Sequence, residues 1–153
     1  MTLRYVLPRC NSGVPGEYHM EELTYDNVGD ALLSRVQEIR AQYDEEFAGY
    51  ADEQPGRYLV FGLVLNPFLF RLLGSREDEK TEVLRRVFNF FEEMAESSDI
   101  QVVNLLQVEE LEPLVTKRDL LAQAWRYMGK RTKALARETA KIWRSEQNLP
   151  VEE

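Results

Sequence analysis

The chain of 153 residues contains one cysteine, Cys10, and one histidine, His19. A single cysteine cannot form an internal disulfide, so the sequence excludes a small secreted scaffold held together by several bridges. One histidine excludes zinc sites built from several His or Cys ligands, and it excludes the duplicated Glu-x-x-His pattern of di-iron proteins. We expect Cys10 to be a free thiol rather than a metal ligand beside His19.

Phosphate-binding loops and long apolar runs are also missing. The eight glycines are scattered, and neither G-x-x-x-x-G-K nor G-x-G-x-x-G occurs. No run approaches the roughly 18 apolar residues of a membrane-spanning helix, and the N-terminus lacks a signal-peptide pattern. The sequence therefore predicts no cofactor, no metal site and no membrane contact, and we expect the protein in the cytoplasm. Most enzyme classes lack support, although acid/base chemistry by carboxylates stays open.

Length and composition indicate one globular domain. The chain is 44% apolar and 30% charged, and its length is that of a single domain. A fold of this size buries about 68–70% of the surface that the unfolded chain exposes. A disordered or collagen-like chain is therefore excluded.

Apolar residues recur at steps of three or four from Asp26 onward, which is the spacing of one helix face. The pattern predicts an all-α fold, a single-domain irregular stack of about six to eight helices. The expected helices span about 27–41, 43–50, 57–65, 67–73, 75–95, 97–114, 116–129 and 131–147. Asn66-Pro67 should separate two of them, since Asn can cap a helix and Pro is tolerated at the first helical position. We divide the chain into an extended arm and loop (1–25), a helical domain (26–147) and a frayed tail (148–153).

Charge is unevenly distributed along the chain. The total is 27 acidic against 19 basic residues, a net charge of −8. Residues 17–56 contain eleven acidic and two basic residues, residues 76–112 contain eleven and four, and residues 117–144 contain nine basic residues opposed by Asp119 and Glu138. One reading is that these are ordinary solvated helix faces. The other is an acidic face that attracts a cationic protein, formed by Asp44, Glu45, Glu46, Glu109, Glu110 and Glu112.

Other candidate sites are weaker. Six basic residues near the C-terminus could contact phosphates: Lys130, Arg131, Lys133, Arg137, Lys141 and Arg144. We do not favour nucleic-acid binding, because the chain is acidic and no helix-turn-helix or base-stacking motif occurs. We expect Trp125, Tyr127 and Trp143 to be core and core-edge aromatics. Three carboxylate pairs can share helix faces, but paired acids on exposed helices are common: Glu79/Glu82, Glu93/Glu96 and Glu109/Glu112.

Three segments resemble a group of small bacterial helical proteins. They are residues 61–68 (FGLVLNPF), 84–95 (LRRVFNFFEEMA) and 103–114 (VNLLQVEELEPL). Many members of this group look like immunity proteins encoded beside polymorphic or contact-dependent toxins. The resemblance covers about residues 28–130, and its motifs are mostly core positions and turns, so it indicates fold more specifically than function. It brings no catalytic residues.

The resemblance implies an immunity protein that binds a cognate toxin domain in the cytoplasm. The charge pattern permits this mechanism, since an acidic face can cover a cationic active-site cleft. A basic nuclease is one toxin of this kind. Two alternatives stay open: a non-enzymatic helical interaction module for another cytoplasmic protein, and an enzyme in which at least two carboxylates converge in a pocket.

Overall fold

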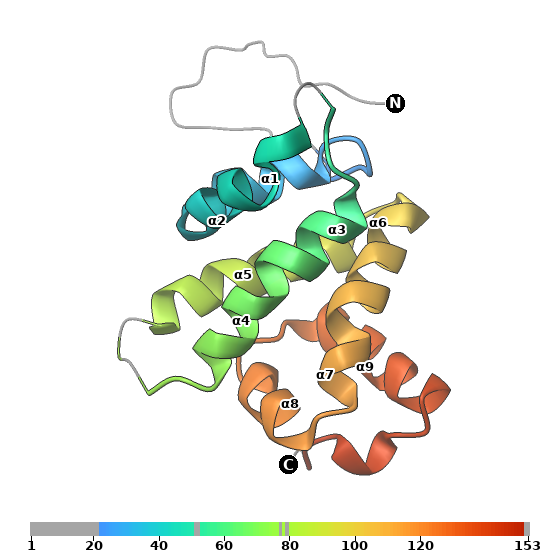
Figure 1. Cartoon of the computed structure of the whole chain (residues 1–153). Coiled ribbons are helices and arrows are strands. Elements are labelled where there is room, and N and C mark those ends of the chain that lie inside the picture. The colour runs from blue at the N-terminus through green and yellow to red at the C-terminus, as the bar shows by residue number, and fades with distance from the viewer. Residues whose placement is uncertain (1–21, 51–52, 77, 79, 152–153) are drawn as a thin grey trace, which may run out of the picture.

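The computed structural model describes residues 22–50, 53–76, 78 and 80–151. Over these ranges the chain forms one compact all-helical domain without strands (Figure 1). The α-helices are α1 (Val28–Arg35), α2 (Arg40–Glu46), α3 (Arg57–Val60), α4 (Asn66–Leu73), α5 (Lys80–Ala95), α6 (Ile100–Leu105), α7 (Glu112–Val115), α8 (Arg118–Trp125) and α9 (Lys130–Ile142). The predicted all-α fold is confirmed. Apart from residues 22–25, the predicted arm of residues 1–25 lies outside the described residues.

Two pairs of α-helices are each joined into one continuous helix by a π-helical turn. The turn η4 (Phe61–Leu65) connects α3 to α4, and η5 (Leu106–Leu111) connects α6 to α7. Counted this way, the described residues form seven helices. Three short 3₁₀ turns complete the fold: η2 (Gln37–Ile39), η3 (Ala48–Tyr50) and η6 (Glu146–Asn148).

Proline explains both π-helical turns. Pro67 and Pro113 are the second residues of α4 and α7. Proline has no N–H, and inside a helix its ring clashes with the carbonyl four residues earlier. A π-helical turn, in which an N–H donates to the carbonyl five residues earlier, relieves this clash. The N–H of Asn66 accordingly donates to the carbonyl of Phe61, five residues before it. The prediction that Asn66-Pro67 separates two helices is therefore wrong: Asn66 is helical, with φ −63° and ψ −47°.

Other helix boundaries also differ from those predicted. The expected helix 27–41 is broken at Val36, whose φ of −122° and ψ of 75° are not helical. Apolar spacing could not reveal this break, because Leu32, Val36 and Ile39 are all buried, as they would be on the face of one continuous helix. The last helix ends at Ile142 rather than near 147, and Arg144 follows with a positive φ of 52°.

Helix α5 is the centre of the core. It packs against α1, α4, α6 and α9. Its buried residues are Leu84, Val87, Phe88, Phe90, Phe91 and Met94. Apolar positions on two sides of α5 explain why helices cover it on several sides.

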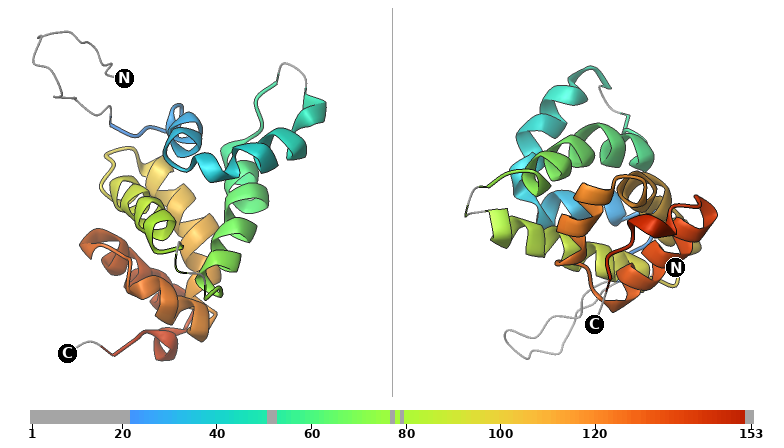
Figure 2. Two further views of the ribbon diagram at one scale, coloured as in Figure 1. Left: turned by 90° about the vertical axis from the view of Figure 1, so that its left-hand side faces the viewer. Right: turned by 90° about the horizontal axis from the view of Figure 1, so that it is seen from below.

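The helix α2, which contains three acidic residues, and the helix α9, which contains five basic residues, lie at opposite ends of the molecule. Figure 1 shows α1 and α2 at one end and α8 and α9 at the other. Figure 2 shows α2 standing out from the other helices before the chain returns to α3. Across the part of the chain that the structure describes, no helix has the length and apolar character needed to cross a membrane.

Candidate functional site

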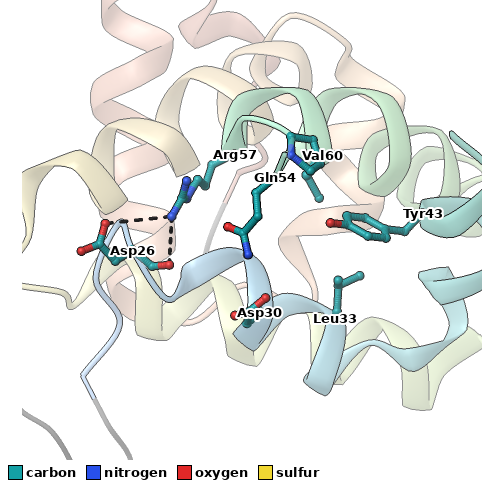
Figure 3. Close-up of a pocket in the computed structure, with 9 residues that line it drawn as sticks. Asp26, Asp30, Leu33, Tyr43, Gln54, Arg57 and Val60 are labelled. Atoms are coloured by element: carbon teal, nitrogen blue, oxygen red, sulfur yellow. Dashed lines mark hydrogen bonds and ion pairs between the residues drawn. The ribbon is translucent and has the colours of Figure 1, made fainter. Parts of the chain in front are cut away.

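A hollow lies between α1, α2 and the start of α3 (Figure 3). It is small, with about 20 Å³ of space that a water-sized molecule can reach. It is lined by Asp26, Gly29, Asp30, Leu33, Tyr43, Gln54, Pro55, Arg57 and Val60. A second depression continues it along α1, and both share Asp30 and Leu33. We call the two together the α1–α2 groove.

Helical spacing places three groove residues on one face of α1. Asp26 precedes the helix, and Asp30 and Leu33 follow at steps of four and three. Tyr43 comes from α2, where its ring packs against Phe47 with centroids 5.2 Å apart. The groove is therefore built from positions that the sequence places on helices, but their convergence depends on the break at Val36.

Arg57 fixes one edge of the groove. Its Nε donates to the carbonyl of Tyr25 over 2.8 Å, and its Nη2 donates to the carbonyl of Asp26 over 3.0 Å. Its guanidinium also lies 5.0 Å from the centre of the Tyr25 ring. The Asp26 carboxylate is 4.0 Å away and fully exposed, so this ion pair adds little. Arg57 thus joins the start of α3 to the segment before α1.

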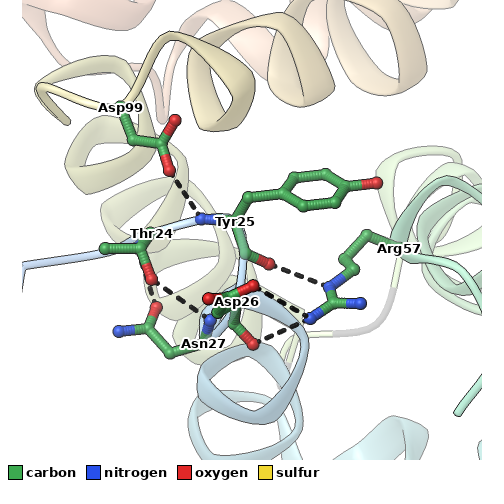
Figure 4. A network of polar contacts seen from close by, with 6 residues as sticks. All are labelled: Thr24, Tyr25, Asp26, Asn27, Arg57 and Asp99. Atoms are coloured by element: carbon green, nitrogen blue, oxygen red, sulfur yellow. Dashed lines mark hydrogen bonds and ion pairs between the residues drawn. The ribbon is translucent and has the colours of Figure 1, made fainter. Parts of the chain in front are cut away.

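The same segment is tied to the start of α6 (Figure 4). Oδ2 of Asp99 accepts a hydrogen bond of 2.8 Å from the Tyr25 N–H, and Oδ1 caps α6 by accepting from the Gln101 N–H over 3.0 Å. The helix predicted over about 97–114 thus begins at Ile100, with Asp99 as its N-cap. Thr24 and Asn27 exchange hydrogen bonds through their side chains and backbone N–H groups. These contacts hold the entrance to α1 in one position relative to α3 and α6.

The first predicted acidic group lies beside the groove. Asp44, Glu45 and Glu46 are the last three residues of α2, and all are exposed. Asp44 is 3.6 Å from Nε of Arg40 in an exposed ion pair that leaves most of both side chains in water. The three carboxylates therefore form an acidic edge on the helix that stands out from the molecule.

The second predicted group lies on another element. Glu109 is in η5 and Glu112 begins α7; both are partly buried. Turn η4 contacts both α2 and η5, so the α3–η4–α4 helix lies between the two acidic groups. The structure does not bring them together into one cluster.

Glu110 does not belong to an acidic face, which corrects the prediction. Its side chain is fully buried, and neither carboxylate oxygen has a hydrogen-bond partner among the described residues. Burial raises the pKa of Glu110 well above its ordinary value, and the charge of Glu109 raises it further. The sequence contained a signal for the burial of Glu110: it lies four residues after Leu106 and four before Leu114, on one helix face, and all three are buried.

The backbone carbonyl of Glu109, in η5, accepts a hydrogen bond from the first residue of α4. Asn66 Nδ2 donates to the Glu109 carbonyl over 2.8 Å. The ordinary helical donor to this carbonyl would be residue 113, which is a proline and has no N–H. Partial burial and then the charge of Glu112 raise the pKa of the Glu109 carboxyl group.

The other candidate residues named from the sequence either contact partners of their own or lie apart from one another. Glu93 accepts two hydrogen bonds of 2.8 Å from Arg35, so it is not available as one half of a catalytic pair. Trp125 is buried as expected, whereas Trp143 is half exposed. Among the described residues, no three His, Cys, Asp or Glu side chains form a group that could hold a metal ion.

The family model described as "Domain of unknown function (DUF7674)" matches residues 30–144, which is most of the chain. The matched region begins within α1 and ends just after α9, so it includes α2 and the two proline-containing helices. No curated protein and no solved structure matches the chain.

Proposed function

We propose that this chain, which belongs to the family of the domain of unknown function DUF7674, is an immunity protein that binds and neutralises a cognate bacterial toxin domain. The observation that supports this most is the acidic edge Asp44, Glu45 and Glu46, exposed on a helix that stands out beside a groove. Binding is the whole activity in this proposal, and it takes place in the cytoplasm.

The negative charge of the acidic edge explains how it would bind a partner. Exposed carboxylates attract a cationic surface, increase the rate of encounter and disfavour partners of like charge. A nuclease has a cationic cleft because its substrate is anionic, so an acidic helix inserted at that cleft blocks the substrate. Tyr50, at the same end of the molecule and 37% exposed, supplies an aromatic contact of the kind enriched in binding hot spots.

A second candidate function is a non-enzymatic interaction module for another cytoplasmic protein. The same exposed edge serves either function, so genetic context and affinity distinguish them. An enzyme is less favoured. Asp26 and Asp30 both line the hollow, but the Asp26 side chain is fully solvated, whereas an acid/base pair of carboxylates needs a pocket that holds both groups together.

Co-expression with the product of the preceding gene tests the proposal. The expected result is survival of cells that the neighbour alone kills, together with co-purification of a stable one-to-one complex. A harmless neighbour that forms no complex would contradict the immunity function and favour the interaction module.

A further inference from the structure

We propose that an exposed apolar stripe on the continuous α3–η4–α4 helix binds the apolar face of a basic, amphipathic helix from a partner protein. The stripe consists of Tyr58, Leu59, Leu63 and Pro67. The identity of the partner as a toxin rests on the proposed function, whereas the recognition chemistry rests on the residues of the stripe and on the carboxylates beside it.

The outer face of this helix lacks the charged residues that a solvated helix face normally contains. No Asp, Glu, Lys or Arg occurs from Tyr58 to Phe70. The outer faces of α5 and α9, in contrast, expose charged residues such as Arg85 and Arg137. The α3–η4–α4 helix is therefore apolar on its solvent side as well as on its core side, as is typical of a surface that another molecule covers.

The exposed apolar side chains form a row rather than a scatter. Leu59 and Leu63 are 42% and 45% exposed, Tyr58 is 36% exposed, and Pro67 is also exposed. Leu59, Leu63 and Pro67 follow one another at steps of four, which places them on one side of the continuous helix. Single exposed apolar residues are common on protein surfaces, whereas a contiguous group marks a site of protein interaction.

Carboxylates flank the stripe on both sides. The helix lies between α2 and the α6–α7 helix (Figure 1), and η4 contacts both α2, which contains the acidic edge, and η5. On the η5 side, Oε1 of Glu109 lies 2.9 Å from the position that a Cβ of Gly62 would occupy, and Glu112 begins α7. Partial burial, then Tyr25 and Glu109, raise the pKa of Tyr58, so Glu109 acts on the stripe itself.

This arrangement fits a basic amphipathic helix. Apolar contact at the centre and polar groups at the rim are the usual anatomy of a protein interface, and an amphipathic helix binds by laying its apolar face on such a surface. Lys and Arg on the flanks of that helix would meet the carboxylates on both sides of the stripe. Nucleic acid and anionic membranes, in contrast, are repelled by the same carboxylates.

The arginines at the two ends of the stripe have contacts within the chain. Arg57 donates to the carbonyls of Tyr25 and Asp26, and the Arg71 guanidinium lies 5.5 Å from the centre of the Phe68 ring. They mark the ends of the apolar row, so the cations of the partner helix are expected along its sides.

The probe is a synthetic helical peptide of leucine and lysine, with leucine at every third or fourth position. Fluorescence anisotropy of the labelled peptide with the full chain should show saturable binding in the micromolar range. Two control peptides, one with glutamate in place of lysine and one with glutamine in place of leucine, should bind at least tenfold more weakly. Absence of saturable binding, or equal binding of the leucine and glutamine peptides, would overturn the proposal.

A pair of substitutions locates the apolar contact. Leu59→Ser and Leu63→Ser together should weaken binding of the leucine–lysine peptide at least tenfold. Ile142→Ser and Val151→Ser are the matched control, because these side chains are also exposed, at 68% and 92%, and lie outside the stripe. Exposed substitutions of this kind should leave both proteins folded, which amide NMR spectra check. Equal binding by the two variants would contradict the stripe as the contact surface.

A second pair tests the charged rim. Glu109→Gln and Glu112→Gln remove two carboxylates beside the stripe and should weaken peptide binding several-fold at low salt. Glu138→Gln and Glu146→Gln change the net charge by the same amount at exposed positions elsewhere. If the control pair weakens binding as much as the first, attraction to net charge alone explains the binding and the proposed rim is wrong.

Two other occupants have distinct signatures. Self-association of the wild type in sedimentation, abolished by Leu59→Ser and Leu63→Ser, would assign the stripe to a second copy of the chain. Amide shifts at residues 58–67 that change after Leu3→Ser and Leu7→Ser in the full chain would assign it to the chain's own N-terminal segment. Either result would overturn the proposal of a partner helix.

The two proposals fail in different ways. If the toxin partner binds the wild type and the Leu59→Ser, Leu63→Ser variant equally, the stripe is wrong and the immunity function stands. If no toxin partner is found, the peptide titration still decides whether the stripe recognises a basic amphipathic helix.

Discussion

Glu110 is a carboxyl group in the hydrophobic core, and its state of protonation affects stability. Both oxygens are buried without hydrogen-bond partners among the described residues. An ionised carboxylate in such surroundings is strongly disfavoured, so the folded protein keeps the proton while the unfolded chain releases it near the ordinary pKa of 4.5. The unfolded state then binds fewer protons, and stability falls as pH rises above that value.

Replacement of Glu110 by Gln should remove this dependence. Between pH 4.5 and the raised pKa of the folded state, the free energy of unfolding of the wild type should fall relative to Glu110→Gln. The slope should be about 1.4 kcal/mol per pH unit. Urea unfolding at a series of pH values measures it. Glu45→Gln, at an exposed position on α2, is the control that should keep the wild-type slope, and parallel curves for wild type and Glu110→Gln would show that Glu110 is not buried.

At the scale of the element, the start of α9 is capped by a residue from α5. The Glu92 carboxylate accepts hydrogen bonds from the N–H groups of Arg131 and Thr132, over 2.8 and 2.9 Å, and from the Thr132 hydroxyl over 2.7 Å. Burial raises the pKa of Glu92, but these hydrogen bonds outweigh it and the net shift is downward. This stabilisation is present above the ordinary pKa near 4.5 and is lost as pH falls through the lower, folded value.

Gly129 leaves space for that cap. A Cβ at Gly129 would lie 2.4 Å from Oε1 of Glu92, so Gly129→Ala must displace a carboxylate held by three hydrogen bonds. We expect a loss of about 1–2 kcal/mol, as for other lost helix caps, measured by denaturant unfolding. Gly62→Ala is the matched control: its Cβ would meet only the end of the Glu109 side chain at 2.9 Å, which makes no hydrogen bond with the described residues. Equal losses for both variants would contradict the role of the cap.

Pro113 and Asn66 should be energetically coupled. Asn66→Ala removes the donor to the Glu109 carbonyl and should cost about 1–3 kcal/mol, because a buried acceptor loses its partner. In a Pro113→Ala background, residue 113 supplies an N–H, so the same substitution should cost less. A double-mutant cycle in urea measures the difference, and strict additivity would refute the link between the proline and the Asn66 hydrogen bond.

The sequence predicted the elements better than their junctions. The helices could be predicted from apolar spacing, because this spacing reflects which positions are buried. Small changes in backbone geometry leave it unchanged. The π-helical turns and the break at Val36 were missed because both leave the buried positions buried. The contact between Glu92 and α9 joins residues 39 and 40 positions apart, and a single sequence contains no local signal for it. For the candidate site, Asp44, Glu45 and Glu46 are exposed as expected, whereas Gly29, Asp30 and Tyr43 become neighbours only through the fold.

At the scale of the whole molecule, charge separation follows the chain. The end formed by α1 and α2 contains the acidic edge, and the end formed by α8 and α9 contains basic residues that include Lys130, Arg131 and Lys141. Such a distribution orients the protein as it approaches a charged partner, and its effect weakens with salt because the Debye length is only about 8 Å at physiological ionic strength. Association with a cationic partner should therefore slow as salt increases, while dissociation changes less.

The most direct test of the central claim is the association rate of the purified partner domain with a charge-reversed protein. Asp44, Glu45 and Glu46 are replaced together by Lys, and the control reverses three exposed acids near the other end, Asp119, Glu138 and Glu146. Both variants change the net charge by the same amount. The account predicts that reversal on α2 slows association at least tenfold at low salt and that the control slows it far less, with both proteins folded. Equal rates for the two variants would contradict the acidic edge as the binding surface.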